Sequence, residues 1–299
     1  MQYPVPMPFG LQFAGYAAAL ARSRERLRRL RREALALQFG GTAGTLAVLN
    51  EKGLEVAERL AALLDLSLPE APWHGNRDRL AEVAAAFAIL AGTCGKVGSD
   101  ISRLMQAEIA EVFETAPLDG GGTANAPRNR NRSAAGAALA AAMIAPNLLA
   151  AILGAQVQED ERSLAGWQAE WATFPALALI TSGGLNAIAD ISQGLEVDKE
   201  RMRGDLEATH GIVMAEAVSC ALAAKIGRAE AESIVQEASR QAAAMKRDLQ
   251  DLLLDHDQVK LSLSVGELAK LFEPLSYQGV AQTFIDRIVG VLQARPGKR

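Results

Sequence analysis

One stretch of the chain combines residues that could bind an anion and transfer a proton. It reads PLDGGGTANAPRNRNRS and covers residues 117–133. Glycine exposes backbone N–H groups, and arginine is a planar cation that pairs with carboxylates. The hydroxyl, amide and guanidinium groups belong to Thr123, Asn125, Asn129, Asn131, Arg128, Arg130 and Arg132. This chemistry suits a ligand with carboxylate or phosphate groups, but the same composition is typical of a solvated linker, and residue types alone do not separate the two.

The segments around this stretch must position it, and they show helical periodicity. Residues 77–114 contain no proline and repeat apolar residues at helical spacing, which predicts one very long helix. Further helices are expected at 9–37, 51–64, 133–158, 166–194, 198–206, 211–226, 228–253, 264–271 and 279–292, with N-caps at Asp198 and Ser264. No stretch of useful length alternates apolar and polar residues as a β-strand does. The pattern predicts an all-α fold, with a long-helix bundle in residues 1–196 and a smaller helical domain in residues 197–299.

The composition excludes several classes of protein. Hydrophobic residues make up 49% of the 299 residues, which is enough for a large core. A net charge of −4 and a pI near 5.6 argue against a general nucleic-acid binder. The arginine-rich run 22–32 is interrupted by Leu27 and Leu30 at helical spacing, so we interpret it as the solvated face of an amphipathic helix.

The uncharged stretch 133–158 is long enough to span a bilayer, yet alanine, glycine and Pro146 favour a helix buried inside a protein bundle. Long helices of this kind need partners on every side, which predicts a homotetramer without membrane contact. Cys94 and Cys220 lack metal-ligand spacing and are expected to be buried, reduced thiols. The N-terminus does not read as a secretion signal, so we expect a cytoplasmic protein.

Residues 122–132 resemble the signature loop GSSxMPxKxNP of the fumarase/aspartase superfamily. Pro127 and Asn131 fall on the proline and asparagine of that motif. Thr123 takes the place of a serine that the family uses as a catalytic acid or base, and Asn129 that of a lysine facing the substrate carboxylate. The motif also departs at Ala126 and Arg132, where the family has methionine and proline.

Other segments resemble the muconate cycloisomerase branch of this superfamily. They read LQFGGTAGTLAVL (37–49), LPEAPWHGNRDRLAE (68–82), LAGTCGKVGSDISRLMQAEIAEVFE (90–114), VQEDERSLAGWQAEWATFP (157–175) and MAEAVS (214–219). The N-terminal residues resemble the middle of a family chain, just after a Thr-x-x-Gln segment. The resemblance therefore implies that the bundle domain is incomplete at its N-terminus.

The resemblance also implies a set of substrate-binding residues. Gln2 matches a glutamine that contacts substrate in relatives, and Arg77 lies in a connector where relatives use arginine for substrate anions. Glu161, Arg162 and Ser163 match a segment that contributes to the substrate pocket. From the residues alone, Arg77 is equally well a charge beside a helix cap, and 161–163 a solvated helix end. His74 lies in the same connector as Arg77.

The activity implied is that of a cycloisomerase in the β-ketoadipate pathway of aromatic catabolism. A carboxylate of 3-carboxymuconate adds across a conjugated double bond and gives a lactone. Thr123 would transfer the proton, while Arg128, Asn129, Arg130 and Asn131 would stabilise the anion. No metal or organic cofactor is implied. Two alternatives stay open, which are a lyase that releases fumarate by breaking a C–N or C–O bond, and a catalytically impaired helical scaffold that oligomerises.

Overall fold

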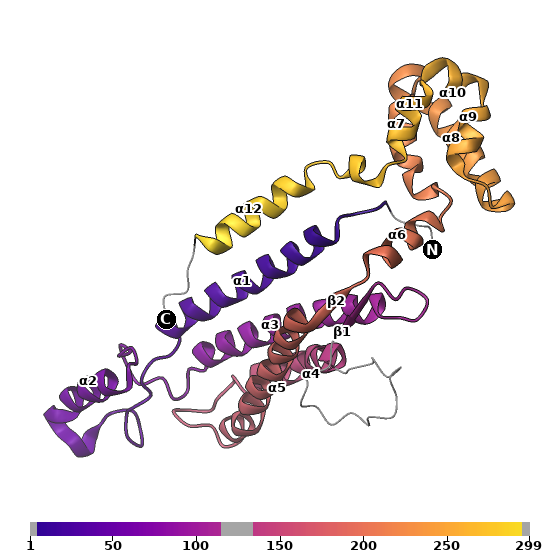
Figure 1. The fold of residues 1–299 in the computed structure, drawn as a ribbon. Helices are drawn as coiled ribbons and strands as arrows, with labels where there is room; N and C mark the ends of the chain where they lie inside the picture. Colours follow the sequence, from indigo (N-terminus) through magenta and orange to yellow (C-terminus); the bar gives the residue numbers. More distant parts are fainter. Residues whose placement is uncertain (1–4, 115–133, 295–299) are drawn as a thin grey trace. The chain divides into compact units, whose positions relative to one another are not determined.

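The computed structural model describes residues 5–114 and 134–294, and the regular secondary structure of this part of the chain is almost entirely helical (Figure 1). Its helices are α1 (Phe9–Glu33), α2 (Gly53–Leu64), α3 (Asp78–Leu104), α4 (Ala134–Gly154), α5 (Gly166–Gly194), α6 (Lys199–Glu207), α7 (Ala215–Ile226), α8 (Arg228–Met245), α9 (Leu249–Asp255), α10 (Asp257–Ser262), α11 (Val265–Leu271) and α12 (Ala281–Gln293). Short 3₁₀ helices lie at η1 (Ala47–Lys52), η2 (Ile212–Met214) and η3 (Pro274–Tyr277). The predicted all-α fold is confirmed.

The chain divides into two compact units. We call Tyr16–Gln106 with Val112–Glu196 the bundle unit, and Met1–Gly15, Ala107–Glu111 and Val197–Arg299 the C-terminal unit. The expected domains, 1–196 and 197–299, remain a proposal. The compact units differ from them because residues 1–15 and 107–111 group with the C-terminal unit.

The centre of the bundle unit consists of α3, α4 and α5, each of which contacts the other two (Figure 1). Their shared core contains Ala84, Ala91, Ala145, Ile152 and Leu177, all nearly or fully buried. Leu30 of α1 and Ala34, directly after its end, pack on Val83 and Ala86 of α3. The apolar residues of α3, α4 and α5 therefore pack these helices against one another.

Small residues allow α4 to approach α3 and α5 closely. A Cβ atom on Gly95 would lie 2.2 Å from the Cβ of Ala142, and one on Gly98 would lie 2.7 Å from the carbonyl oxygen of Ala135. On α5, a Cβ atom on Gly184 would lie 2.9 Å from the Cβ of Ala141. These glycines are required by the close approach of neighbouring backbones.

Replacing Gly95 by alanine should destabilise the bundle by about 1–3 kcal/mol, because the new methyl group overlaps Ala142 and the helices must separate. The matched control is Gly92→Ala on the same helix, where a new Cβ would meet nothing within 4 Å. That control should be stabilising by up to about 1 kcal/mol, since alanine is the better helix former. Urea unfolding monitored by circular dichroism measures both changes. Equal stability of the two variants would contradict the close packing of α3 on α4.

Three helices of the described part, α3, α4 and α5, are long and apolar enough to cross a membrane by length and composition. The number rises to four if α6 and the bent continuation Ile212–Ile226 count as one span. Only 22% of the most apolar window of α4 and 28% of that of α5 is buried within the chain, against 50% for α3. Much of the apolar surface of α4 and α5 is therefore left uncovered by this chain alone.

In the C-terminal unit, α7 and α8 form an antiparallel pair that α9, α10 and α11 close around a core (Figure 1). Fully buried Val218, Leu222, Leu249 and Leu253 lie at its centre. Both predicted N-caps are confirmed, because the Asp198 side chain accepts a hydrogen bond from the N–H of Arg201 and Ser264 forms a capping box with Glu267.

The very long helix predicted over 77–114 is wrong beyond Leu104. Ala110 adopts a left-handed φ of 53°, and β1 (Val112–Glu114) pairs with β2 (Leu195–Val197) in a small sheet. Arg201 donates to the carbonyl oxygens of Glu108 and Ile109 at 2.5 and 2.7 Å. These carbonyl oxygens accept hydrogen bonds from Arg201 instead of from N–H groups of a continuing helix. The helix therefore ends although the apolar periodicity of the sequence continues.

A second predicted helix, 228–253, is broken into α8 and α9. Lys246 has a left-handed φ of 50°, and the N–H of Leu249 donates to the carbonyl oxygen of His210 at 2.9 Å. Burying Leu249 requires this change of direction. The helix predicted over 133–158 likewise ends at Gly154, and α10 (Asp257–Ser262) was not predicted.

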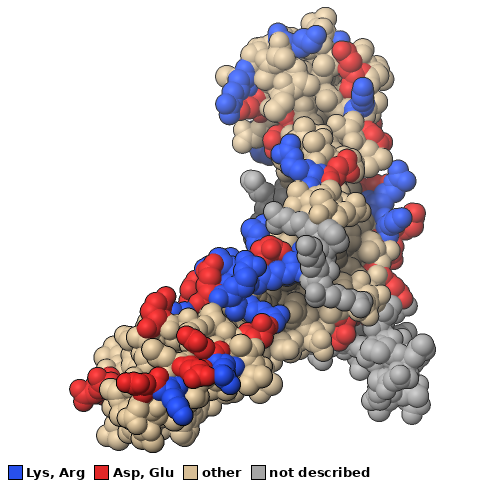
Figure 2. All heavy atoms as spheres, turned by 90° about the vertical axis from the view of Figure 1, so that its left-hand side faces the viewer, with Lys and Arg blue, Asp and Glu red and all other residues tan. Residues whose placement is uncertain are grey.

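The interpretation of the arginine-rich run is confirmed. Its leucines face inward, with Leu30 only 2% exposed, whereas the arginines lie outside on α1. Several pair with acidic side chains, among them Arg28 with Glu25 and Arg29 with Glu33 and Glu82. Figure 2 shows basic side chains lying beside acidic ones on the face in view.

Candidate functional site

A buried ion pair anchors the connector that precedes α3. Nε and Nη2 of Arg77 donate to the two carboxylate oxygens of Glu170 on α5 at 2.8 and 2.5 Å, and both side chains are at most 6% exposed. Nη1 of Arg77 also reaches Gln38 at 3.4 Å, and the guanidinium group lies 5.1 Å from the ring centroid of Trp73. The indole of Trp73 in turn donates to the carbonyl oxygen of Leu37 at 3.0 Å. Arg77 therefore joins three separate segments.

We call residues 40–44, which contain three glycines, the glycine-rich turn, and Arg162 holds this turn through two hydrogen bonds. Its Nε and Nη2 donate to the carbonyl oxygens of Thr42 and Gly41 at 3.0 and 2.7 Å. Its guanidinium group also lies 5.1 Å from the ring centroid of Trp167. The arginine is exposed, but its donors are directed at backbone oxygens of the turn.

Ser163 is buried and joins Glu159 to the start of α5. Its hydroxyl donates to a carboxylate oxygen of Glu159 at 2.8 Å and accepts from the N–H of Gly166 at 2.9 Å. The hydrogen bond from Ser163 lowers the pKa of Glu159 below its ordinary value. Ser163 thus fixes the turn that carries residues 159–162.

These contacts enclose a polar cleft of about 370 Å³. It is lined by Ala43, Gly44, Pro72, His74, Gly75, Asn76, Gln158, Asp160 and Glu161. The backbones meet closely here, since a Cβ atom on Gly75 would lie 2.8 Å from the carbonyl oxygen of Asp160, itself a left-handed residue with φ 48°. Three segments that are distant in the sequence thus form one cleft within the bundle unit.

His74 supplies a titratable group to this cleft. Burial lowers its pKa below the ordinary value, and the positive charges of Arg162 and Arg77 add to this effect. The imidazole is therefore neutral at neutral pH and offers one donor and one acceptor. In the same cleft, Oε1 of Gln158 is buried and has no hydrogen-bond partner within the described residues.

The structure brings together some of the predicted site residues. Glu161 lines the cleft, while Arg77, Arg162 and Ser163 form its supports and direct their polar groups at protein atoms. Their roles toward a substrate stay predictions. The remaining predicted residues lie outside the described residues, and they are Gln2, Thr123, Arg128, Asn129, Arg130 and Asn131.

The supporting residues Gln38, Trp73 and Glu170 were not predicted. Arg77 and Glu170 are separated by 93 residues, so no spacing rule links them. The one available signal for Glu170 is its position within the segment 157–175, which resembles the muconate cycloisomerase branch. In residues 5–114 and 134–294, no group of three or more His, Cys, Asp or Glu side chains is placed to hold a metal ion.

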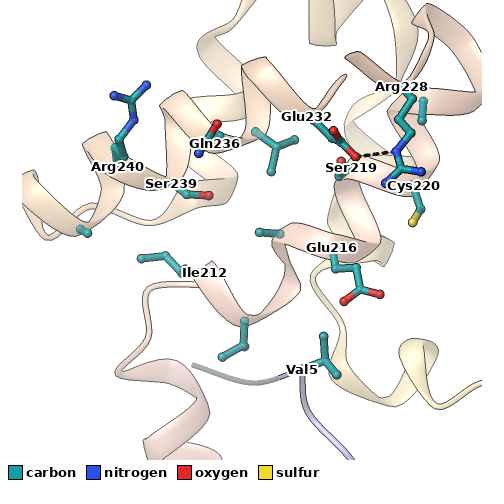
Figure 3. A pocket seen from close by; sticks show the side chains of 15 residues that line it. Val5, Ile212, Glu216, Ser219, Cys220, Arg228, Glu232, Gln236, Ser239 and Arg240 are labelled. Carbon is teal, nitrogen blue, oxygen red and sulfur yellow. Dashed lines mark hydrogen bonds and ion pairs between the residues drawn. The ribbon is translucent and has the colours of Figure 1, made fainter. Parts of the chain in front are cut away.

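A second, larger groove of about 1160 Å³ lies in the C-terminal unit (Figure 3). Gln236, Ser239 and Arg240 of α8 line one side, and Ile212 and Glu216 line the other. Arg228 and Glu232 at its rim pair at 2.7 Å. The groove contains none of the predicted site residues.

The two cysteines differ, which corrects the expectation that both are buried. Cys94 is fully buried among the long helices, and burial raises the pKa of its thiol to about 11. Cys220 is exposed because it lies on the side of α7 that lines the groove rather than the core. Both thiols are free.

Two family models match the chain. One, described as Lyase, covers residues 1–141, and the other, described as Adenylosuccinate lyase C-terminus, covers residues 211–288. Both descriptions name lyases. Together with the relatives described next, they show that the chain belongs to the fumarase/aspartase superfamily.

Similar proteins include two 3-carboxy-cis,cis-muconate cycloisomerases. The chain is 55% identical to that of Bradyrhizobium diazoefficiens, with 98% of this chain and 65% of the relative covered. It is 45% identical to that of Pseudomonas aeruginosa, with 96% and 62% covered. The crystal structure of 3-carboxy-cis,cis-muconate lactonizing enzyme from Pseudomonas putida matches with a TM-score of 0.90 and 44% identity, covering 98% of this chain and 65% of that one. The chain thus spans a little under two thirds of the length of these relatives.

Proposed function

We propose that the protein is a cycloisomerase that converts 3-carboxy-cis,cis-muconate into a lactone. The observation that carries the proposal is the polar cleft of the bundle unit, which is formed by 43–44, 72–76 and 158–161. These residues belong to the segments 37–49, 68–82 and 157–175, which resemble the muconate cycloisomerase branch. The similarity to curated cycloisomerases over almost all of this chain supports the same substrate class.

The proposed reaction is an isomerisation whose only added species is a proton, which a protein group delivers and then regains from solvent. A carboxylate oxygen of the substrate forms a C–O bond with one carbon of a double bond, and a proton adds to the other carbon. Negative charge develops on the neighbouring carboxylate as this happens, so donors and cations placed there lower the barrier. No metal or organic cofactor is required by this scheme.

We assign the roles by residue. Thr123 transfers the proton, and Arg128, Asn129, Arg130 and Asn131 stabilise the developing anion. Gln2 and Arg162 orient the substrate, Arg162 through the glycine-rich turn that it holds. Arg77 and Ser163 position the cleft through Glu170 and the start of α5. Glu161 borders the cleft, where its negative charge would keep substrate carboxylates toward the arginines.

The proposed assembly is a cytoplasmic homotetramer that binds neither nucleic acid nor membrane. The support is the uncovered apolar surface of α4 and α5, where Met143 and Leu179 are 75% and 72% exposed. Covering such surface with other subunits is worth about 25 cal/mol for each Å² of apolar area. Light scattering that shows a folded monomer at micromolar concentration would contradict this assembly.

The function is tested by following loss of 3-carboxymuconate absorbance together with identification of the lactone by NMR. Two proteins are assayed. One is the chain alone, and the other, called the joined protein, is a fusion of the chain with the part of the Bradyrhizobium relative that the chain does not cover. We expect lactone formation by the joined protein above the uncatalysed rate. Release of fumarate from succinyl adducts, without lactone formation, would identify the lyase alternative. Absence of both activities in a folded, joined protein would favour an oligomerisation scaffold.

A further inference from the structure

The proposed mechanism gives no role to His74, the histidine that lines the polar cleft of the bundle unit. The imidazole is partly buried, and its two nitrogens have no hydrogen-bond partner within residues 5–114 and 134–294. The ring is also fixed in place, because a Cβ atom on Gly40 would lie 2.8 Å from its Cε1 and 2.7 Å from the Cβ of Pro72. A fixed side chain with open nitrogens is suited to binding a ligand in the cleft.

A second open group in the same cleft is the amide oxygen of Gln158. Nε2 of this side chain donates to the carbonyl oxygen of Ala155 at 2.7 Å, which leaves Oε1 as the atom without a partner among the described residues. The amide is held closely, since a Cβ atom on Gly166 would lie 2.9 Å from Nε2. A buried acceptor without a donor is unfavourable, so an additional N–H in the cleft is stabilised there.

The charges of the cleft do not favour an anion as they stand. Its described lining includes Asp160 and Glu161 but no lysine or arginine. The donors of the two supporting arginines point elsewhere, because Arg77 pairs with a buried carboxylate of α5 and Arg162 donates to backbone oxygens. Protonation of His74 would give the lining the positive charge that it lacks, together with one more N–H donor.

The protonation state of His74 depends on the charges that surround the ring. These are Arg77 and Arg162 and, along the cleft, Asp160 and Glu161. In the free protein burial and the positive charges of the arginines lower the pKa of the imidazole. A carboxylate bound beside the ring acts in the opposite direction, since an opposite charge within about 4–6 Å favours the protonated form. The imidazole is thus neutral in the empty cleft and gains a proton when an anion occupies it.

We infer that His74 is a substrate-binding residue, which takes up a proton from solvent and pairs as an imidazolium with a carboxylate of the substrate. The inference rests on the proposed function for the identity of that substrate, a tricarboxylate. One ring N–H donates to the carboxylate, and the second N–H is left for the oxygen of Gln158. Because binding takes up a proton, the affinity falls as the pH rises from the pKa of the free imidazole to that of the bound one.

The test measures binding of propane-1,2,3-tricarboxylate to the chain, since this probe has the carboxylates of the substrate but no double bond to react. Calorimetric titration in two buffers with different heats of ionisation counts the protons taken up. We expect a net uptake near neutral pH, and an affinity that falls by up to about tenfold for each pH unit across the window. His74→Gln keeps a donor and an acceptor but cannot be protonated, so its binding should be weaker, without proton uptake and independent of pH.

The matched control is His256→Gln, because His256 lies at the end of α9 in the C-terminal unit and not in the cleft. This control should bind the probe with the same proton uptake as the unchanged chain. Circular dichroism verifies that both variants are folded. Binding without proton uptake by the unchanged chain overturns the inference, and so does the absence of binding or an equal uptake by His74→Gln.

A second readout needs no variant of His74. The chain has three histidines, and the NMR signals of the other two are assigned with His210→Gln and His256→Gln. Saturation with the probe should move the titration of the His74 signal to higher pH and leave the other two signals titrating as before. An unmoved His74 titration overturns the inference.

The two outcomes for the site and for the reaction are distinguishable. Proton uptake by His74 on binding of the probe, in a protein whose joined form makes no lactone, would retain the binding role and reject the proposed reaction. Lactone formation by the joined protein with the same KM in His74→Gln as in the unchanged sequence would reject the binding role alone.

Discussion

Replacing Arg77 by alanine should lower the free energy of unfolding by about 3–5 kcal/mol. The substitution leaves the carboxylate of Glu170 buried without its cation, and both side chains are at most 6% exposed. It also removes the contacts of the guanidinium group with Gln38 and Trp73. Urea unfolding followed by circular dichroism measures the change. Glu170→Ala should be destabilising to a similar extent, since it leaves the buried arginine unpaired.

Two comparisons distinguish the buried ion pair from a general effect of losing charge. Arg59→Ala removes an arginine that pairs with Glu55 on the surface at 2.7 Å, with side chains 77% and 59% exposed, and it should change stability by no more than about 0.5 kcal/mol. The double variant Arg77→Met, Glu170→Leu fills the site with apolar groups and should be more stable than either single alanine variant. If Arg77→Ala is as mild as Arg59→Ala, the pair does not anchor the connector.

Converting Thr123 to serine and Asn129 to lysine together should raise the rate of lactone formation by up to about 10²- to 10³-fold. The resemblance to the superfamily signature implies that position 129 faces the substrate carboxylate, where a lysine would add a full positive charge. Threonine retains the hydroxyl of serine, but its methyl group on a stiff β-branched carbon restricts how the hydroxyl is presented. The assay is lactonisation of 3-carboxymuconate by the joined protein.

The matched control is Asn125→Lys, which adds the same charge in the same segment at a position where the signature has no lysine. It should leave the rate within about twofold of the unchanged protein, because a charge outside the reacting site does not stabilise the transition state. If the unchanged protein is already as fast as the Bradyrhizobium relative and the double variant is no faster, then Asn129 is not a lost cation. Arg128 or Arg130 would then supply the charge.

The sequence identified the segments that line the cleft, but it did not identify the partners of their side chains. The resemblance identified 37–49, 68–82 and 157–175, and residues of all three line the cleft. It also implied that Arg77 and Arg162 face a substrate. In the structure their guanidinium groups bond Glu170 and the backbone at Gly41 and Thr42. A resemblance carries over a residue type and its place in the chain, but the partner of a long side chain depends on which segments meet after folding.

The sequence by itself determined the helical class, the bounds of α5 and the caps at Asp198 and Ser264. These features depend on periodicity and on side chains within one turn of the helix end, so local residues are sufficient to specify them. Only the tertiary structure decided that α3 ends at Leu104, where Arg201 takes the carbonyl oxygens of the following turn. It also decided that α8 ends before Lys246 and that Arg77 pairs with Glu170. In each of these cases a hydrogen bond joins residues at least 39 positions apart, and the local sequence contains no signal for a partner at that distance.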